Sequence, residues 1–132
     1  MKIYIDATET QIGKIGSFAA KKALQGDEIF ILNSEKAIIS GNKENVVETI
    51  RNWRNKGGNS LKGPIVPKSP ERLLKRMIRG MLPWDRTRGR EAYKRIKCFK
   101  SNEFDSSKIG VISLKEKTPT KYLTLEEVVK LI

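Results

Sequence analysis

The stretch KIYIDATETQIGKIGSFAAKKALQGDEIFILN, residues 2–33, decides the fold class. It opens with a short β-rich run at residues 2–5, and residues 29–32 form a continuous apolar run that suits a strand covered on both faces. Between these runs, apolar residues recur at helical spacing, namely Ile12, Ile15, Phe18, Ala19 and Ala23. Thr8 or Thr10 could cap this helix, and Gly26 follows it as a turn signal. Strand, helix and strand in this order predict a layered α/β architecture.

The alternation continues after this unit. Residues 37–40 predict another short strand, and the helical period returns from residue 43 until Gly57 and Gly58. Residues 57–70 are rich in Gly and Pro, which predicts a loop. The first half of the chain therefore supplies three expected strands and two expected helices.

The second half begins with a strongly amphipathic segment. Ser69-Pro70 is typical of a helix start, and the helix is expected to run to residue 82. A further strand is expected within residues 109–114. Thr124 and Glu127 have the spacing of a capping box, which predicts a terminal helix.

Charge is distributed unevenly along the chain. The whole chain has a net charge of +12, and residues 51–100 hold 16 of its 27 Lys and Arg residues but three of its 15 acidic residues. The rest of the chain is nearly neutral. A strongly basic segment on a neutral body predicts a partner with dense negative charge, most commonly nucleic acid phosphate. An anionic membrane surface and a merely solvated face are the alternatives.

Length and composition exclude several classes of protein. The 132 residues fit one domain, expected to span residues 1–132, and no apolar stretch approaches the roughly 18 residues that a membrane span needs. The N-terminal residues do not resemble a signal peptide, so a cytoplasmic location is expected. The chain has no histidine, which excludes Ser-His-Asp and Cys-His catalysis and the common zinc sites. The single cysteine, Cys98, is expected to be an inert, partly buried side chain.

Two catalytic or nucleotide-binding interpretations remain open. Gly13 and Gly16 do not complete a G-x-G-x-x-G motif, so they are expected to allow close helix packing. Asp6 and Glu9 follow the first strand, where open α/β sheets often place active sites. With Asp85 they would be the candidates for a metal-dependent nuclease, although capping and helix-dipole roles explain the first two equally well.

The basic segment carries the candidate RNA contacts. Four cations lie on one side of the helix opposite a Leu/Met stripe, three arginines alternate along an expected extended loop at residues 84–90, and three lysines lie before the helix. These ten residues are Arg72, Lys75, Arg76, Arg79, Arg86, Arg88, Arg90, Lys56, Lys62 and Lys68. A helix with flexible arms suits folded RNA, where phosphate contacts and shape dominate recognition. Trp53, Trp84 and Tyr93 could stack on bases, but Trp53 is expected instead to face the core.

The order of motifs resembles the ribosomal protein L13 family of the large subunit, in its archaeal and eukaryotic style. The resemblance rests on Ile5-Asp6-Ala7 and the Gly13-Gly16 segment, on Leu32-Asn33-Ser34-Glu35-Lys36, and above all on RGMLP at residues 79–83 followed by GREA at residues 89–92. It covers residues 3–100 well and the tail less specifically. The long C-terminal helix of eukaryotic members is missing, which favours an archaeal type.

The resemblance implies a three-layer α/β/α domain with a small, mostly parallel central sheet and a basic helix-plus-loop extension. It implies a structural, non-catalytic role in the ribosome, with large-subunit ribosomal RNA and neighbouring ribosomal proteins as partners and support of subunit assembly. It implies no obligatory cofactor, no metal and no small-molecule substrate. The metal-dependent nuclease, a DNA-binding module and a peripheral membrane protein remain the rivals of this interpretation.

Overall fold

The computed structural model describes residues 2–55, 67–100, 111–114 and 119–132. Its central sheet has the strand order β4-β2-β1-β5, and every neighbouring pair in it is parallel. The strands are β1 (Lys2–Asp6), β2 (Glu28–Leu32), β4 (Ile96–Cys98) and β5 (Val111–Ser113). The predicted α/β class with a mostly parallel central sheet is thus confirmed.

The first strand-helix-strand unit forms where the sequence predicts it. Helix α1 (Ile12–Leu24) connects β1 to β2 and is followed by Gly26, whose φ of 99° lies in the left-handed region that favours glycine. All four residues of the apolar run 29–32 are buried, which confirms that β2 is covered on both faces. The predicted threonine cap is wrong, because the N-cap residue is Gln11 and its side chain makes no capping bond.

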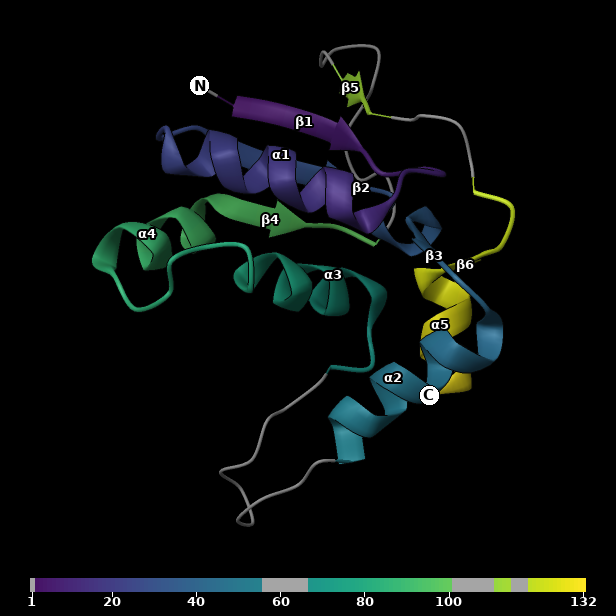
Figure 1. Ribbon diagram of the computed structural model, residues 1–132. Coiled ribbons are helices and arrows are strands. Elements are labelled where there is room, and N and C mark those ends of the chain that lie inside the picture. The colour runs from purple at the N-terminus through teal and green to yellow at the C-terminus, as the bar shows by residue number, and fades with distance from the viewer. Residues whose placement is uncertain (1, 56–66, 101–110, 115–118) are drawn as a thin grey trace.

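Three helices pack into the core beside the sheet. They are α1, α3 (Pro70–Arg79) and α4 (Thr87–Arg95), which lie side by side in Figure 1. Their buried side chains, such as Ile15, Leu74 and Ala92, join one hydrophobic cluster with Ile5 and Ile29 of the sheet. Burial of this cluster is the main source of stability, at roughly 25 cal/mol per Å² of apolar surface removed from water.

Aromatic rings line the other face of the sheet. Tyr4 and Phe30 are opposite each other in the register of β1 and β2, and their rings stack with centroids 4.9 Å apart. Phe99 continues the row at 6.3 Å from Phe30, and the Lys97 ammonium lies 5.7 Å from the Phe30 centroid. The alternation of isoleucine and aromatic residues along the strands therefore gives each face of the sheet its own packing.

A second unit lies at the carboxyl ends of the central strands (Figure 1). It consists of the short helix η1 (Ser34–Lys36), the antiparallel pair β3 (Ile38–Ser40) and β6 (Tyr122–Thr124), and the helices α2 (Lys43–Asn55) and α5 (Leu125–Leu131). The predicted capping box is confirmed: the Glu127 amide donates to the Thr124 hydroxyl, and the Thr124 amide donates to the Glu127 carboxylate. The expected loop at residues 57–70 lies largely outside the described residues, as does part of the expected strand at 109–114. None of the described helices combines the length and apolar character needed to cross a membrane.

Candidate nucleic-acid interface

Helix α3 presents the basic face that its sequence predicts. Pro70 occupies the first turn, where its missing N–H costs no hydrogen bond. Leu73, Leu74 and Ile78 are buried on one side of the helix. The opposite side carries cations: the Arg72 side chain is exposed, and three others are half-buried, namely Lys75, Arg76 and Arg79. The apolar side fixes the helix in the core, so the cationic side has a defined direction.

The expectation of an extended basic loop at residues 84–90 is wrong, because helix α4 begins at Thr87. Arg86 is its N-cap residue, and Arg88 and Arg90 are already helical. The physical reason is Gly89, which is buried in the first turn and would place an added Cβ 2.1 Å from the carbonyl oxygen of Pro83. Glycine here permits a close approach of α4 to the end of the preceding segment, whereas the sequence alone suggests a flexible loop.

An aromatic pair joins α3 to α4 and gathers cations around itself. The rings of Trp84 and Tyr93 meet edge to face at 5.0 Å. The Arg79 guanidinium lies 4.2 Å from the Trp84 centroid, and the Lys75 ammonium lies 4.7 Å from that of Tyr93. Arg90 donates from Nε to the Trp84 carbonyl over 2.9 Å. Rings and cations thus hold each other in place by cation–π attraction, so part of the cationic surface is preorganised.

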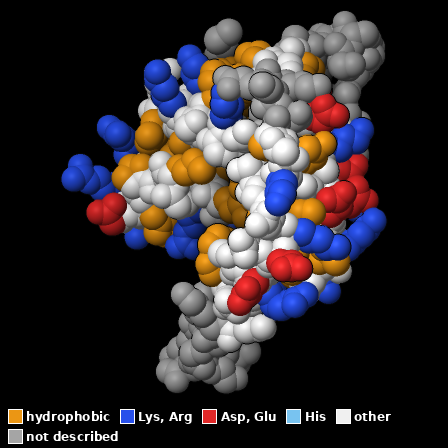
Figure 2. Space-filling view, turned by 45° about the vertical axis from the view of Figure 1, so that its right-hand side comes forward, with side chains coloured by type: hydrophobic (Ala, Val, Ile, Leu, Met, Phe, Trp, Pro, Cys, Tyr) orange, Lys and Arg blue, Asp and Glu red, His pale blue; other side chains and the backbone are white. Residues whose placement is uncertain are grey.

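The seven cations of α3, α4 and the turn between them are hereafter called the α3–α4 basic surface. Its members are Arg72, Lys75, Arg76, Arg79, Arg86, Arg88 and Arg90. Within the part of the chain that the structure describes, none of the seven forms an ion pair with a carboxylate. In Figure 2 Lys and Arg side chains appear on both sides of the molecule, whereas the acidic side chains gather mainly toward the right, so the left edge is mostly cationic. A dense set of cations without acidic partners produces a positive potential that attracts polyanions.

Of the three remaining candidate lysines, the structure describes one. Lys68 is exposed directly before α3. Lys56 and Lys62 lie outside the described residues.

Several arginines of the basic segment serve the fold instead. Arg95 donates to the Ala23 carbonyl at the end of α1 over 2.9 Å. Arg51 and Arg54 donate to the carbonyls of Leu131 and Ile132 at the end of α5. Cations at these positions satisfy free carbonyls and complement the negative ends of helix dipoles. Counting charges along the chain could not separate these structural arginines from the α3–α4 basic surface.

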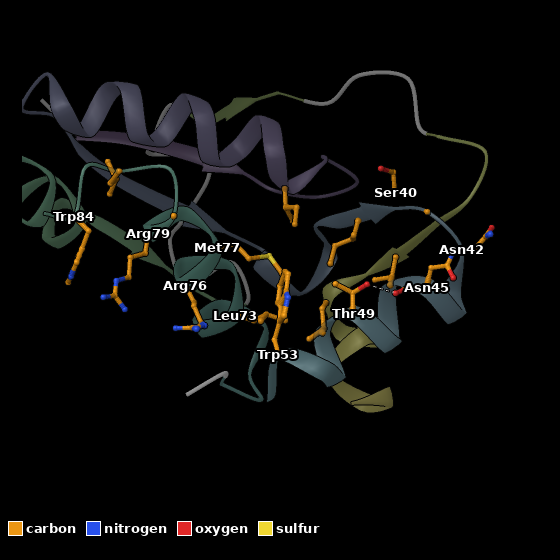
Figure 3. A pocket seen from close by; sticks show the side chains of 17 residues that line it. Ser40, Asn42, Asn45, Thr49, Trp53, Leu73, Arg76, Met77, Arg79 and Trp84 are labelled. Atoms are coloured by element: carbon orange, nitrogen blue, oxygen red, sulfur yellow. Dashed lines mark hydrogen bonds between the residues drawn. The ribbon is translucent and has the colours of Figure 1, made fainter. Parts of the chain in front are cut away.

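A groove opens between α2 and α3 and extends the interface beyond the cations. Its volume is about 1010 Å³, and its walls include Thr49 and Trp53 of α2 and Arg76, Met77 and Arg79 of α3. Figure 3 shows Trp53 reaching from α2 toward Met77, with both arginines on the α3 side. Trp53 was expected to face the core, but its side chain is 41% exposed, so this expectation is wrong. Helical spacing placed Trp53 on the apolar side of α2 correctly but could not show that α3 leaves space beside it.

Of the three carboxylates in the nuclease interpretation, Asp6 is held by hydrogen bonds within the fold. The Asp6 carboxylate accepts bonds from the Thr8 hydroxyl over 2.7 Å, the Thr8 amide over 3.0 Å and the Asn33 amide group over 3.1 Å. Burial raises the pKa of Asp6, but these hydrogen bonds and the charge of Lys36 outweigh it, so the net pKa is lowered. No group of three His, Cys, Asp or Glu side chains able to hold a metal ion occurs among the described residues. Asp6 therefore has a role in shaping the turn after β1.

The structure also bears on the expectations for Cys98 and for the two glycines of α1. Burial raises the pKa of the Cys98 thiol to about 12, which keeps it protonated and agrees with an inert side chain. Gly16 lies against Met81 and Ile78 and allows the close approach of α1 to α3 that was expected. Gly13 does not share this role, because an added Cβ there would meet no atom within 4 Å.

The fold and the interface together define a class of protein. A small α/β domain with a partly preorganised set of surface cations, aromatic rings among them and an adjoining groove has the features of a nucleic-acid-binding protein.

Comparison with known proteins then narrows the class. A sequence model of the family described as ribosomal protein L13 matches residues 1–105. Relatives named large ribosomal subunit protein uL13 include one from Archaeoglobus fulgidus, which is 40% identical over 94% of this chain and 83% of its own length. Those of Methanocaldococcus jannaschii and Picrophilus torridus are 40% and 38% identical, over 96% and 98% of this chain and 93% and 96% of their own lengths. The chain belongs to the ribosomal protein L13 family, as its motifs predict.

Proposed function

We propose that this protein is a structural, non-catalytic constituent of the large ribosomal subunit that binds large-subunit ribosomal RNA and supports subunit assembly. It works in the cytoplasm, within the ribosome, with neighbouring ribosomal proteins as further partners. The whole chain acts as one domain, residues 1–132, whose RNA-facing part is the segment of about residues 51–100. Membership of the ribosomal protein L13 family supports this proposal most broadly.

The single observation that carries the RNA-binding part is the α3–α4 basic surface. Its seven cations have no carboxylate partner among the described residues, and two of them are held against the rings of Trp84 and Tyr93. Cations left unpaired on a folded surface repel one another, and bound phosphates remove that repulsion. Guanidinium groups also match phosphate oxygens through paired hydrogen bonds. The surface therefore serves to neutralise RNA phosphates brought close together.

The mechanism is binding without chemistry. The core fixes α3 and α4, and these helices hold the guanidinium groups at set positions against the RNA backbone. Arg72, Lys75, Arg76, Arg79, Arg86, Arg88 and Arg90 are the principal contacts, and Lys56, Lys62 and Lys68 are secondary ones. No cofactor, metal, membrane or small-molecule substrate takes part.

The test removes three exposed cations at the start of α4. Arg86→Gln, Arg88→Gln and Arg90→Gln together should weaken binding to structured ribosomal RNA and make the dependence of log K on log salt shallower by about 2 to 3, since each lost phosphate contact removes roughly 0.7 to 0.9 from the slope. Arg90 would lose its exposed hydrogen bond to the Trp84 carbonyl and its contact with the Trp84 ring at 6.0 Å, so the melting temperature should fall only slightly. Salt titrations of RNA binding and thermal unfolding measure both quantities.

A matched variant controls for total charge. Lys43, Lys121 and Lys130 are exposed on α2, β6 and α5 or beside them, away from α4. Their joint replacement by Gln removes the same charge and should leave the salt slope nearly unchanged. Equal effects of the two triple variants would show that binding depends on net charge alone and would refute the assigned surface. Cleavage of labelled RNA in the presence of Mg²⁺ would refute the non-catalytic role.

A further inference from the structure

The groove between α2 and α3 has features that contacts to phosphates alone do not explain. Its volume of about 1010 Å³ is at the upper end of the range of small-molecule sites, so it has room for more than a single small group. Apolar side chains such as Ile39, Ile50 and Met77 form much of its lining. Its charged lining residues, among those that the structure describes, are the two cations Arg76 and Arg79. The groove thus offers both an apolar interior and positive charge.

Trp53 is the side chain that gives the groove its specific chemistry. It reaches from α2 toward Met77 of α3 (Figure 3), yet 41% of its surface remains exposed. An exposed indole ring in a groove that also contains two guanidinium groups can serve as a stacking platform for a nucleobase, because every base has a π face and its phosphates can pair with the cations. Trp84, at the other end of the lining, is already engaged by Arg79 and Tyr93.

The groove is continuous with the α3–α4 basic surface. Arg76 and Arg79 belong to both, so a strand of RNA held along α3 passes the mouth of the groove. On the α2 side, Asn45 and Thr49 add neutral polar groups instead of carboxylates. A protein segment would match the apolar interior but would need acidic side chains of its own to pair with both guanidinium groups. RNA brings the anionic charge with every nucleotide.

We infer that the groove receives an unpaired segment of RNA, with at least one base stacked on Trp53 and its flanking phosphates paired with Arg76 and Arg79. Bases can enter only where they are free of a duplex, because paired bases present no face for stacking. The inference rests on the proposed RNA-binding function and adds a selectivity to it. The α3–α4 basic surface binds RNA backbone of any form, and the groove favours single-stranded over duplex RNA.

The experiment measures the affinity of four proteins for each of two RNA probes. The probes are an unstructured, purine-containing oligoribonucleotide and an RNA duplex, and the proteins are the unaltered chain, Trp53→Ala, Trp53→Phe and Tyr122→Ala. Tyr122 is a matched control, because it is an aromatic residue that is 42% exposed and does not line the groove. Trp53→Ala should lose about tenfold in affinity for the single strand and stay within about twofold for the duplex. Trp53→Phe should recover most of the loss, and Tyr122→Ala should bind both probes like the unaltered chain.

The other outcomes distinguish the inference from the function beneath it. Unchanged binding of both probes by Trp53→Ala would overturn the groove assignment while leaving RNA binding by α3 and α4 intact. An equal loss of affinity for both probes, without recovery in Trp53→Phe, would also overturn the groove assignment, because that result would show a purely structural role for Trp53. Failure of the unaltered chain to bind either probe would overturn the proposed RNA-binding function itself. Unchanged RNA binding by Trp53→Ala together with loss of a large-subunit protein from its complexes would assign the groove to a protein partner.

Discussion

The Asp6 side chain shows how a residue with the position of a catalytic group can serve the backbone. It lies at the carboxyl end of β1, and its three hydrogen bonds tie the turn that follows β1 to Asn33 after β2. Asn33 itself has a φ of 58°, a left-handed conformation that asparagine tolerates better than most residues. The network therefore fixes how two neighbouring strands leave the sheet.

The lowered pKa of Asp6 predicts a dependence of stability on pH. A carboxyl group whose pKa is lower in the folded than in the unfolded chain stabilises the fold above its unfolded pKa, which is 3.8 for an aspartate side chain. The stabilisation is lost as pH falls through the folded value. Asp6→Asn should cost about 1 kcal/mol at pH 7, because neutral hydrogen bonds are weaker than charged ones. Urea unfolding at pH values from 7 to 3 measures this difference.

The variant and the unaltered chain should converge in stability as the pH drops below 3.8. A constant difference at all pH values would mean that the Asp6 charge does not contribute. RNA binding should be the same for both proteins at pH 7, because Asp6 is not part of the α3–α4 basic surface. Loss of a Mg²⁺-dependent nuclease activity in Asp6→Asn would instead revive the enzymatic alternative.

At the scale of elements, periodicity predicted more than composition did. The apolar spacings of α1, α2, α3 and α5 placed all four helices, because an amphipathic helix repeats its buried side every three to four residues. The start of α4 was missed, since a segment of alternating arginines around a glycine carries no apolar period. Its order comes from tertiary contacts: Gly89 against Pro83, and Arg90 with Trp84. Local sequence cannot display such contacts.

The junction of α3 and α4 supplies a prediction about stability. Gly89→Ala should destabilise the fold by about 1 to 3 kcal/mol, because its Cβ would press against the backbone of Pro83 rather than a movable side chain. Gly13→Ala is the matched control, since it also lies in the first turn of a helix but has open space around it. That variant should be neutral or more stable by up to about 1 kcal/mol. Chemical denaturation of both variants gives the comparison, and equal stabilities would refute the packing of α4 described above.

The position of the candidate site followed from the sequence in part. The cations of α3 were identified with their correct face, because helical spacing fixes which residues share a side. The aromatic pair between α3 and α4, the structural arginines Arg51, Arg54 and Arg95, and the groove beside Trp53 became visible only in three dimensions. Each depends on two elements meeting, which a pattern within one element does not report.

At the scale of the whole molecule, the hydrophobic core and the cationic surface lie in different parts of the fold. The sheet and its isoleucine-rich core give a rigid body, and residues 67–95 turn one side of that body into a cationic surface. Rigid placement of guanidinium groups reduces the entropy lost when phosphates bind. The excess charge of +12 lies within residues 51–100, so the rest of the chain stays nearly neutral.

The central claim is that this chain is held in the large ribosomal subunit by contacts to RNA. The most direct measurement is sucrose-gradient sedimentation of a native lysate at low and high salt, with the fractions probed for this protein. We predict that it migrates with the large subunit at low salt and remains there as salt is raised, because many phosphate contacts act together within a folded particle. Absence from the large-subunit fractions at every salt concentration would contradict the account.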